Sequence, residues 1–140
     1  METEKSINSY KKGFIDGIPI GLGYFSVSFT FGMMAVNTGL TVPTALLISM
    51  TNLTSAGQFA GIGLIAAGAT YIEMILTQLV INLRYALMSL SLSQKTDRTF
   101  NFLHRLFISF GITDEIFAVA SSQPCEVGIR YMYGLITIPY

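Results

Sequence analysis

Hydrophobic residues form long blocks along this chain, and charged residues gather in the short segments between the blocks. Residues 17–72 carry no formal charge at all. A helix needs about 20 residues to cross the ~30 Å hydrocarbon core of a bilayer, so this stretch alone is long enough for two crossings. The pattern predicts an all-α, polytopic transmembrane protein.

The pattern divides into five apolar blocks. They cover residues 17–40, 44–70, 71–93, 106–120 and 129–140. The last two are too short for an upright span at about 1.5 Å of rise per residue. We therefore expect a single membrane domain over residues 1–140 that contains broken or re-entrant helices.

Glycines recur every four residues around the start of the first block, at Gly13, Gly17 and Gly21. Residues four apart share one helical face, so these glycines form a smooth ridge. A neighbouring backbone can approach such a ridge closely.

The centre of the second block, TNLTSAGQFAG, is polar and rich in glycine. A continuous helix of this composition is poor in lipid, so we expect a helix break at Gly57 and Gly61. Broken helices often build substrate sites in transporters, because half-helix ends present unpaired N–H and C=O groups. The alternative is an ordinary span whose Ser and Thr side chains bond to their own helix.

The third block contains Arg84, ten residues before the polar segment that starts at Gln94. Its Cα would lie roughly 15 Å inside an upright helix, close to the midplane. A charge there costs at least ~2.5 kcal/mol on insertion scales and usually faces protein or water. Glu73 lies about 16 Å away along the same helix, so Arg84 needs a partner from another element. Snorkelling to the interface is the alternative, although this distance exceeds the reach of one side chain.

The fourth block supplies the candidate partner. Gly111 can interrupt a helix, and Thr113 can cap a new one whose first turn contains Asp114 and Glu115. The depth of these acids would match that of Arg84. The alternative is an interfacial turn that leaves both acids in water.

Two basic clusters suggest the orientation of the chain: Lys5, Lys11 and Lys12, and Lys95, Arg98 and Arg105. The positive-inside rule assigns both clusters to the cytoplasm, so residues 1–12 form a cytoplasmic tail and residues 94–105 a cytoplasmic loop. An even number of crossings must then separate them. Since three blocks lie in the interval, the polar second block is expected to be re-entrant.

Composition excludes several classes of protein. Charged residues make up 11% of the chain and mean hydropathy is +0.57, whereas soluble domains have about 25% charged residues. The net charge of zero argues against a nucleic-acid partner. One cysteine and one histidine leave no pattern for a metal site, and we expect neither a cofactor nor an enzymatic function.

Four motifs together resemble the AzlC family of branched-chain amino acid transport proteins. They are GIPIGLGYFSVSFTFG, TSAGQFAG, INLRYALMS and ITDEIFA, in the order that the family shows them. The resemblance covers roughly residues 13–140. Family members are much longer, so the resemblance implies the N-terminal part of a longer transporter fold, and we expect the chain to be a fragment or truncated.

The resemblance implies a multi-pass bacterial plasma-membrane exporter of leucine, isoleucine, valine and analogues such as azaleucine, acting with a small AzlD-like membrane subunit. The motif positions carried over are Gln58, Phe59, Asn82, Arg84, Thr113, Asp114 and Glu115. A histidine often follows the arginine in this family, where this chain has Tyr85.

For such an exporter, we expect Arg84 to meet the substrate carboxylate, and Asp114 or Glu115 to meet the ammonium or to carry a coupling proton. Phe59 would line an apolar pocket for the substrate side chain. Arg84 serving only as a structural counter-ion to Asp114 is equally open. The alternative function is a non-transporting or inactive truncated subunit that serves assembly or channel formation.

Overall fold

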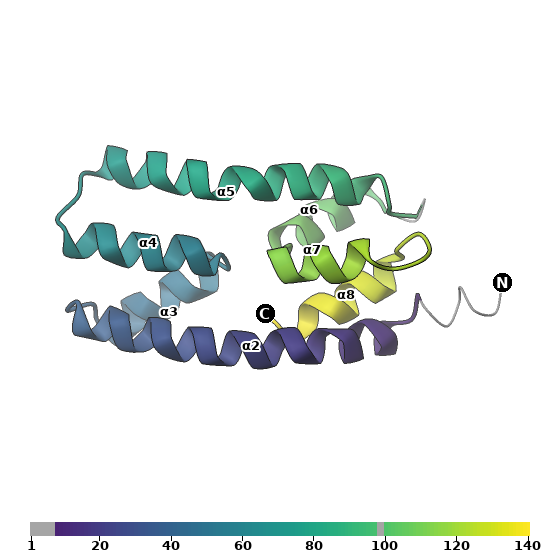
Figure 1. Cartoon of the computed structure of the whole chain (residues 1–140), viewed down its shortest axis with the longest axis horizontal. Helices are drawn as coiled ribbons and strands as arrows, with labels where there is room; N and C mark the ends of the chain where they lie inside the picture. Colours follow the sequence, from purple (N-terminus) through teal and green to yellow (C-terminus); the bar gives the residue numbers. More distant parts are fainter. Residues whose placement is uncertain (1–7, 98–99) are drawn as a thin grey trace. The chain divides into compact units, whose positions relative to one another are not determined.

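The structure of the chain, a computed structural model, describes residues 8–97 and 100–140. These residues form seven α-helices and no extended strand (Figure 1). The helices are α2 (Tyr10–Asn37), α3 (Val42–Thr51), α4 (Ser55–Ala66), α5 (Tyr71–Ser93), α6 (Phe102–Phe110), α7 (Asp114–Ser121) and α8 (Ile129–Thr137). The predicted all-α class is confirmed. Two of the basic residues used for orientation, Lys5 and Arg98, lie outside the described residues.

Helices α2 and α5 are long and apolar enough to cross a membrane by length and composition. Both expose many large apolar side chains, including Phe25 and Phe29 on α2 and Leu79 and Val80 on α5. Lipid satisfies such side chains as well as a protein core does, so exposed apolar faces are ordinary on spanning helices. The fold is that of a helical membrane protein.

The chain divides into two compact units, and α2 and α5 contribute to both. Residues Tyr24–Arg84 form one unit, which we call the hairpin unit. Residues 1–23 and 85–140 form the other, which we call the discontinuous unit.

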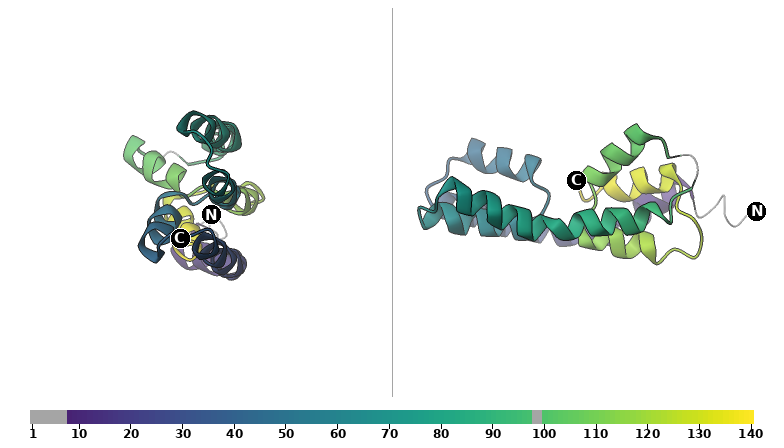
Figure 2. Two further views of the ribbon diagram at one scale, coloured as in Figure 1. Left: turned by 90° about the vertical axis from the view of Figure 1, so that its left-hand side faces the viewer. Right: turned by 90° about the horizontal axis from the view of Figure 1, so that it is seen from above.

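In the hairpin unit, α3 and α4 run in opposite directions and are joined by residues 52–54 (Figures 1 and 2). With 10 and 12 residues, each is too short to cross a bilayer. Together with α2 they bury a core of Phe31, Ala35, Ala45 and Ile62. The second apolar block is therefore a broken helical hairpin that returns toward the end where it began.

The position of the break differs from the sequence prediction. The helix is interrupted at residues 52–54, and both Gly57 and Gly61 lie inside α4. Gly57 serves packing instead, because a Cβ atom there would lie 2.7 Å from Oε1 of Gln78. The glycine allows α5 to approach α4, and the local sequence around it remains helical.

Helix α8 forms the centre of the discontinuous unit, and α6 and α7 both pack on it. Its residues Tyr131, Met132 and Leu135 have no exposed surface. The Tyr131 hydroxyl donates to Oδ2 of Asp16 at 2.8 Å and accepts a hydrogen bond from Gln123 at 2.8 Å. A buried polar group of this kind is stable only when it has such partners.

The expected glycine ridge packs on α8. A Cβ atom at Gly17 would lie 2.8 Å from the Leu135 carbonyl oxygen, and one at Gly13 would overlap the Tyr131 carbonyl. Gly134 on α8 faces Tyr10 in the same way. The two backbones therefore cross at a distance that only glycine permits at these positions.

Two helices begin inside the segments that the sequence assigns to the tail and to the loop. Helix α2 begins at Tyr10, because the Ser9 hydroxyl accepts from the Lys12 backbone N–H at 3.2 Å and caps the first turn. Helix α6 begins at Phe102, so the end of the 94–105 loop is helical. The assignment of the tail and the loop to the cytoplasm stays a prediction.

Candidate functional site

The break between α3 and α4 is built from extended backbone. Asn52 has φ −123° and ψ 96°, and Thr54 has φ −80° and ψ 104°. The Asn52 side chain replaces part of the lost helical bonding, since its Oδ1 accepts from the Thr54 N–H at 3.2 Å. Side chains of this kind offer the backbone an alternative to continued helix.

Two amides of α5, Gln78 and Asn82, face the break. They are four residues apart and so share one face of the helix. Gln78 donates to the Gly57 carbonyl oxygen at 2.7 Å, and Asn82 donates to Oε1 of Gln78 at 3.2 Å. The Thr54 hydroxyl then donates to Oδ1 of Asn82 at 2.9 Å. These hydrogen bonds join α5 to both the break and the first turn of α4.

The ends of the two short helices meet at this network. Gln58 is 8% exposed, and its Nε2 donates to the Asn52 carbonyl oxygen beside the end of α3. Thr54 occupies the N-cap position of α4, but its side chain makes no capping hydrogen bond. The start of α4 thus keeps the positive end of its dipole without a side-chain cap.

A cavity of about 190 Å³ lies beside the network, between α3, α4 and α5. Its polar lining consists of three amide side chains, Asn52, Gln58 and Gln78. The rest of its wall is apolar or small: Ile48, Gly57, Gly61, Ile62, Ile65 and Met74. Drug-sized ligands occupy about 300–1,000 Å³, so this cavity suits a smaller molecule with a short aliphatic part and a polar head.

The structure gathers some of the predicted site residues here and separates others. Gln58, Gly57 and Gly61 line the cavity, and Asn82 belongs to the network. Phe59 does not line the cavity, because its ring packs edge-on against Phe31 with centroids 6.2 Å apart.

Three residues of the network, Asn52, Thr54 and Gln78, were not identified as site residues from the sequence. The spacing of Gln78 and Asn82 within an apolar helix was the signal that could have found them. Polar residues four apart in such a helix require polar partners on one side.

The remaining predicted residues lie around the start of α7. Helix α6 ends at Phe110 with Gly111 as its C-cap, and the Thr113 hydroxyl accepts from the Ile116 N–H at 3.5 Å. Asp114 and Glu115 occupy the first turn of α7, where carboxylates complement the helix dipole.

Arg84 is the last residue of the hairpin unit, whereas Asp114 and Glu115 belong to the discontinuous unit. The pairing of Arg84 with these acids stays a prediction.

Comparison with known proteins gives consistent matches. The family model described as "AzlC protein" matches residues 19–140. An uncharacterized membrane protein of Archaeoglobus fulgidus is 33% identical over 126 residues, which are 90% of this chain and 54% of that protein. One of Helicobacter pylori is 32% identical over 124 residues, 88% of this chain and 53% of that protein.

The inner membrane protein YgaZ of Escherichia coli is 28% identical over 115 residues, covering 82% of this chain and 47% of YgaZ. The chain therefore spans about half the length of the relatives it matches. No solved structure gives a significant match.

Proposed function

Because the chain belongs to the AzlC family, we propose that it is part of a secondary transporter that exports branched-chain amino acids. Its substrates would be leucine, isoleucine, valine and analogues such as azaleucine. It would act as a multi-pass protein of the bacterial plasma membrane, with a cytoplasmic N-terminus and a small AzlD-like membrane subunit as partner. Its function would be transport, with no enzymatic step.

The observation that carries this proposal is the broken hairpin α3–α4 with its small cavity. Transporters bind substrates where helices are interrupted at bilayer depth, because backbone groups freed from the helix can contact the ligand. In this chain the interruption lies between two short helices, neither of which can span. The cavity beside it combines amide groups with an aliphatic wall.

A branched-chain amino acid matches the two kinds of lining. Its aliphatic side chain would lie against Ile48, Ile62, Ile65 and Met74. Its charged head would lie at the break, with the carboxylate toward the start of α4 and the ammonium toward carbonyl and amide oxygens. The amides of Asn52 and Gln78 would orient the head without adding a net charge.

Arg84, Asp114 and Glu115 would complete the pathway for substrate or coupling ion. We propose that Arg84 meets the carboxylate during transport, and that Asp114 or Glu115 meets the ammonium or carries a proton. This part of the proposal rests on the matched depths that the sequence predicts.

Selectivity within the substrate class would be modest. One methylene changes binding in an apolar pocket by only about 1–3 kcal/mol. Leucine, isoleucine and valine would therefore share the site, which suits an exporter of a class of amino acids. The glycine ridge gives no support to the alternative role in assembly, because α8 covers it within the chain.

Binding of radiolabelled leucine to the purified chain tests the proposal. We expect saturable binding that isoleucine and valine compete for and that aspartate and lysine do not. Proteoliposomes containing the chain with an AzlD-like subunit should then release leucine faster than liposomes with either protein alone. Monodisperse, helical protein without saturable leucine binding would overturn the proposal.

A further inference from the structure

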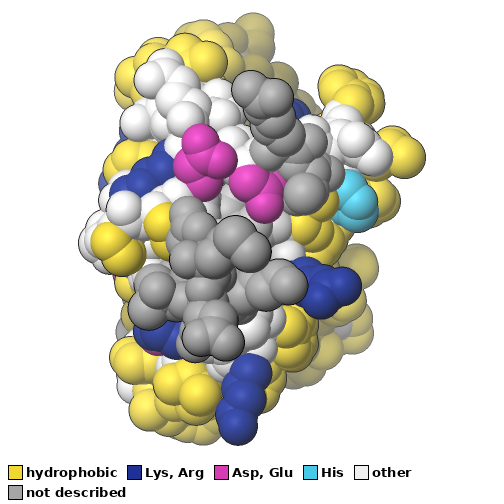
Figure 3. All heavy atoms as spheres, turned by 90° about the vertical axis from the view of Figure 1, so that its right-hand side faces the viewer, with side chains coloured by type: hydrophobic (Ala, Val, Ile, Leu, Met, Phe, Trp, Pro, Cys, Tyr) yellow, Lys and Arg dark blue, Asp and Glu magenta, His cyan; other side chains and the backbone are white. Residues whose placement is uncertain are grey.

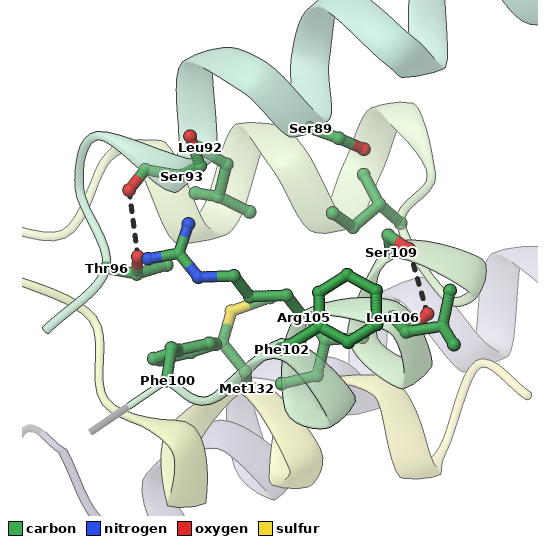
Figure 4. A pocket seen from close by; sticks show the side chains of 12 residues that line it. Ser89, Leu92, Ser93, Thr96, Phe100, Phe102, Arg105, Leu106, Ser109 and Met132 are labelled. Atoms are coloured by element: carbon green, nitrogen blue, oxygen red, sulfur yellow. Dashed lines mark hydrogen bonds between the residues drawn. The ribbon is translucent and has the colours of Figure 1, made fainter. Parts of the chain in front are cut away.

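A second cavity, larger than the one beside the break, lies in the discontinuous unit. It has a volume of about 300 Å³ and is lined by the end of α5, the segment after it, α6 and α8 (Figure 4). Most of its wall is apolar, with Leu92, Phe100, Leu106, Ile108 and Met132 among the lining residues. This volume is within the range of small-molecule sites.

Arg105 is the one charged residue among those that line this cavity. Its side chain extends across the cavity toward the Thr96 side in Figure 4. Within residues 8–97 and 100–140, no carboxylate forms an ion pair with its guanidinium. The cavity therefore offers one positive charge at the edge of an apolar space and no acidic group.

Three of the four hydroxyl side chains that line the cavity, those of Ser93, Thr96 and Ser109, already donate to backbone carbonyl oxygens, and Ser89 is the fourth. Ser93 donates to the Leu90 carbonyl at 2.7 Å, and Thr96 donates to the Ser93 carbonyl at 2.9 Å. Ser109 donates to the Leu106 carbonyl at 2.8 Å. An anion at this edge would find its hydrogen-bond donors on the guanidinium, whose planar fork matches phosphate and carboxylate oxygens.

Ser89, Leu92, Ser93 and Thr96 of the lining lie around the end of α5, and the end of a helix that spans a bilayer lies at the membrane surface. Basic and acidic side chains gather on the face shown in Figure 3, with apolar side chains around them. Helix α6 exposes large apolar side chains next to Arg105: Phe102, Leu103, Leu106 and Phe107. Exposed apolar residues beside a cation are typical of a surface at the boundary between acyl chains and headgroups.

We propose that this cavity binds an anionic phospholipid. One acyl chain lies between α5, α6 and α8, and the phosphate is held by Arg105. The charge and the shape both favour this ligand, because a lipid of this class combines an apolar tail with an anionic head. Basic sites between membrane helices recognise anionic headgroups in this way.

The proposed amino-acid substrate does not fit the same cavity. Its ammonium group would need an acidic partner or free carbonyl oxygens, and the lining residues contain no carboxylate. A free fatty acid shares the required chemistry of one anionic head and one tail. The test therefore includes a separate measurement with fatty acid.

The chain contains no tryptophan, so a single introduced tryptophan gives an unambiguous fluorescence signal. Phe102 is 79% exposed and lines the cavity, which makes Phe102→Trp a suitable reporter. The full chain is reconstituted in bilayers of ordinary phosphatidylcholine. Three separate samples then receive a small amount of one lipid that is brominated on its acyl chain: phosphatidylglycerol, phosphatidylcholine or a fatty acid. Bromine quenches tryptophan only on close contact.

We expect brominated phosphatidylglycerol to quench Phe102→Trp at about fivefold lower mole fraction than brominated phosphatidylcholine, the effect of one basic residue near the surface. Adding Arg105→Gln should make the two lipids equal, and Arg105→Lys should retain a preference. Raising the salt concentration should weaken the preference in the chain that keeps Arg105.

The matched control is Phe107→Trp. Phe107 is 67% exposed on the same helix but does not line the cavity. It should respond equally to all phospholipids. Equal quenching of Phe102→Trp by both phospholipids, or no quenching, would overturn the proposal. If the brominated fatty acid quenches Phe102→Trp and brominated phosphatidylglycerol does not, the assignment to a phospholipid would be overturned.

Discussion

Gln78 donates a 2.7 Å hydrogen bond to the carbonyl oxygen of Gly57, and this contact connects α5 to the first turn of α4. The position of the Gln78 side chain requires a glycine at residue 57. A side chain at Gly57 would displace the Gln78 amide, since a Cβ atom there would lie 2.7 Å from Oε1. The geometry of the break is therefore set from outside the hairpin, by α5.

Replacing Gln78 with leucine should weaken both the fold and the proposed substrate site. The variant removes the donor to Gly57 and leaves the Asn82 amide without its acceptor. An unsatisfied buried polar group costs roughly 1–3 kcal/mol, and we expect leucine binding to fall about tenfold or more. Thermal unfolding and radiolabelled leucine binding measure the two effects. Leu79→Ala, at an exposed neighbour on α5, is the control and should change neither.

Replacing Met74 with alanine should alter the choice among substrates. Met74 forms part of the apolar wall, so its truncation enlarges the cavity. Larger apolar amino acids such as phenylalanine should gain affinity relative to valine, by roughly tenfold if one or two methylenes of space are gained. Competition binding measures the ratio. Met50→Ala, at an exposed residue of α3, is the control. If the ratio of phenylalanine to valine affinity is the same in both variants, Met74 does not line the substrate site.

Alanine at Gly17 should destabilise the crossing of α2 with α8. Its Cβ atom would lie 2.8 Å from the Leu135 carbonyl oxygen, so the helices must separate. We expect a loss of about 1–3 kcal/mol, as for other overpacked sites. Thermal unfolding in detergent gives the change in stability.

Gly23→Ala provides the matched control for this crossing. It lies in the same helix, and a Cβ atom there would meet nothing within 4 Å. Alanine has a higher helix propensity than glycine, so this variant should be neutral or more stable by up to about 1 kcal/mol. Equal destabilisation of both variants would contradict the close crossing.

Arg84→Ala and Asp114→Asn should each abolish export when made separately. The depths predicted from the sequence place both charges in the membrane, where removing one leaves the other without compensation. Efflux from proteoliposomes measures the effect, with helical content and monodispersity checked first. Lys11→Ala, at the basic start of α2, should retain export. Wild-type efflux in either folded variant would refute the proposed role.

The double variant separates a transport role from a structural one. If Arg84 only neutralises Asp114, then combining Arg84→Ala with Asp114→Asn should restore export, because no charge remains buried alone. If Arg84 binds substrate and Asp114 binds substrate or carries a proton, the double variant should stay inactive.

The helices were predictable from the sequence wherever local signals mark their ends. The third apolar block and α5 share the same bounds, 71–93. A capping interaction accounts for the start: Glu73 accepts from the Thr70 N–H at 2.7 Å, and the Glu73 N–H donates back to the Thr70 hydroxyl at 3.3 Å. The overall class also followed from composition, because a long stretch without charge is typical of helices that lie in lipid.

The place of the break was not predictable because it depends on contacts between helices. Gly57 and Gly61 look like interruptions in the sequence, yet α4 continues through them and uses Gly57 to receive α5. That the ring of Phe59 packs on Phe31, outside the cavity lining, was not predictable for a related reason. In a helix that is apolar on all sides, the pattern does not reveal which face meets protein and which meets lipid.

The glycine crossing of α2 and α8 also sets an order of events during synthesis. Tyr24–Arg84 is one continuous stretch, so the hairpin unit can form its contacts as soon as Arg84 has left the ribosome. The other unit needs residues 1–23 and 85–140 together, and Gly17 receives its neighbour only when Leu135 arrives. Contacts so distant in sequence form late. The amino-terminal half of α2 therefore cannot make this crossing until more than a hundred further residues have been added.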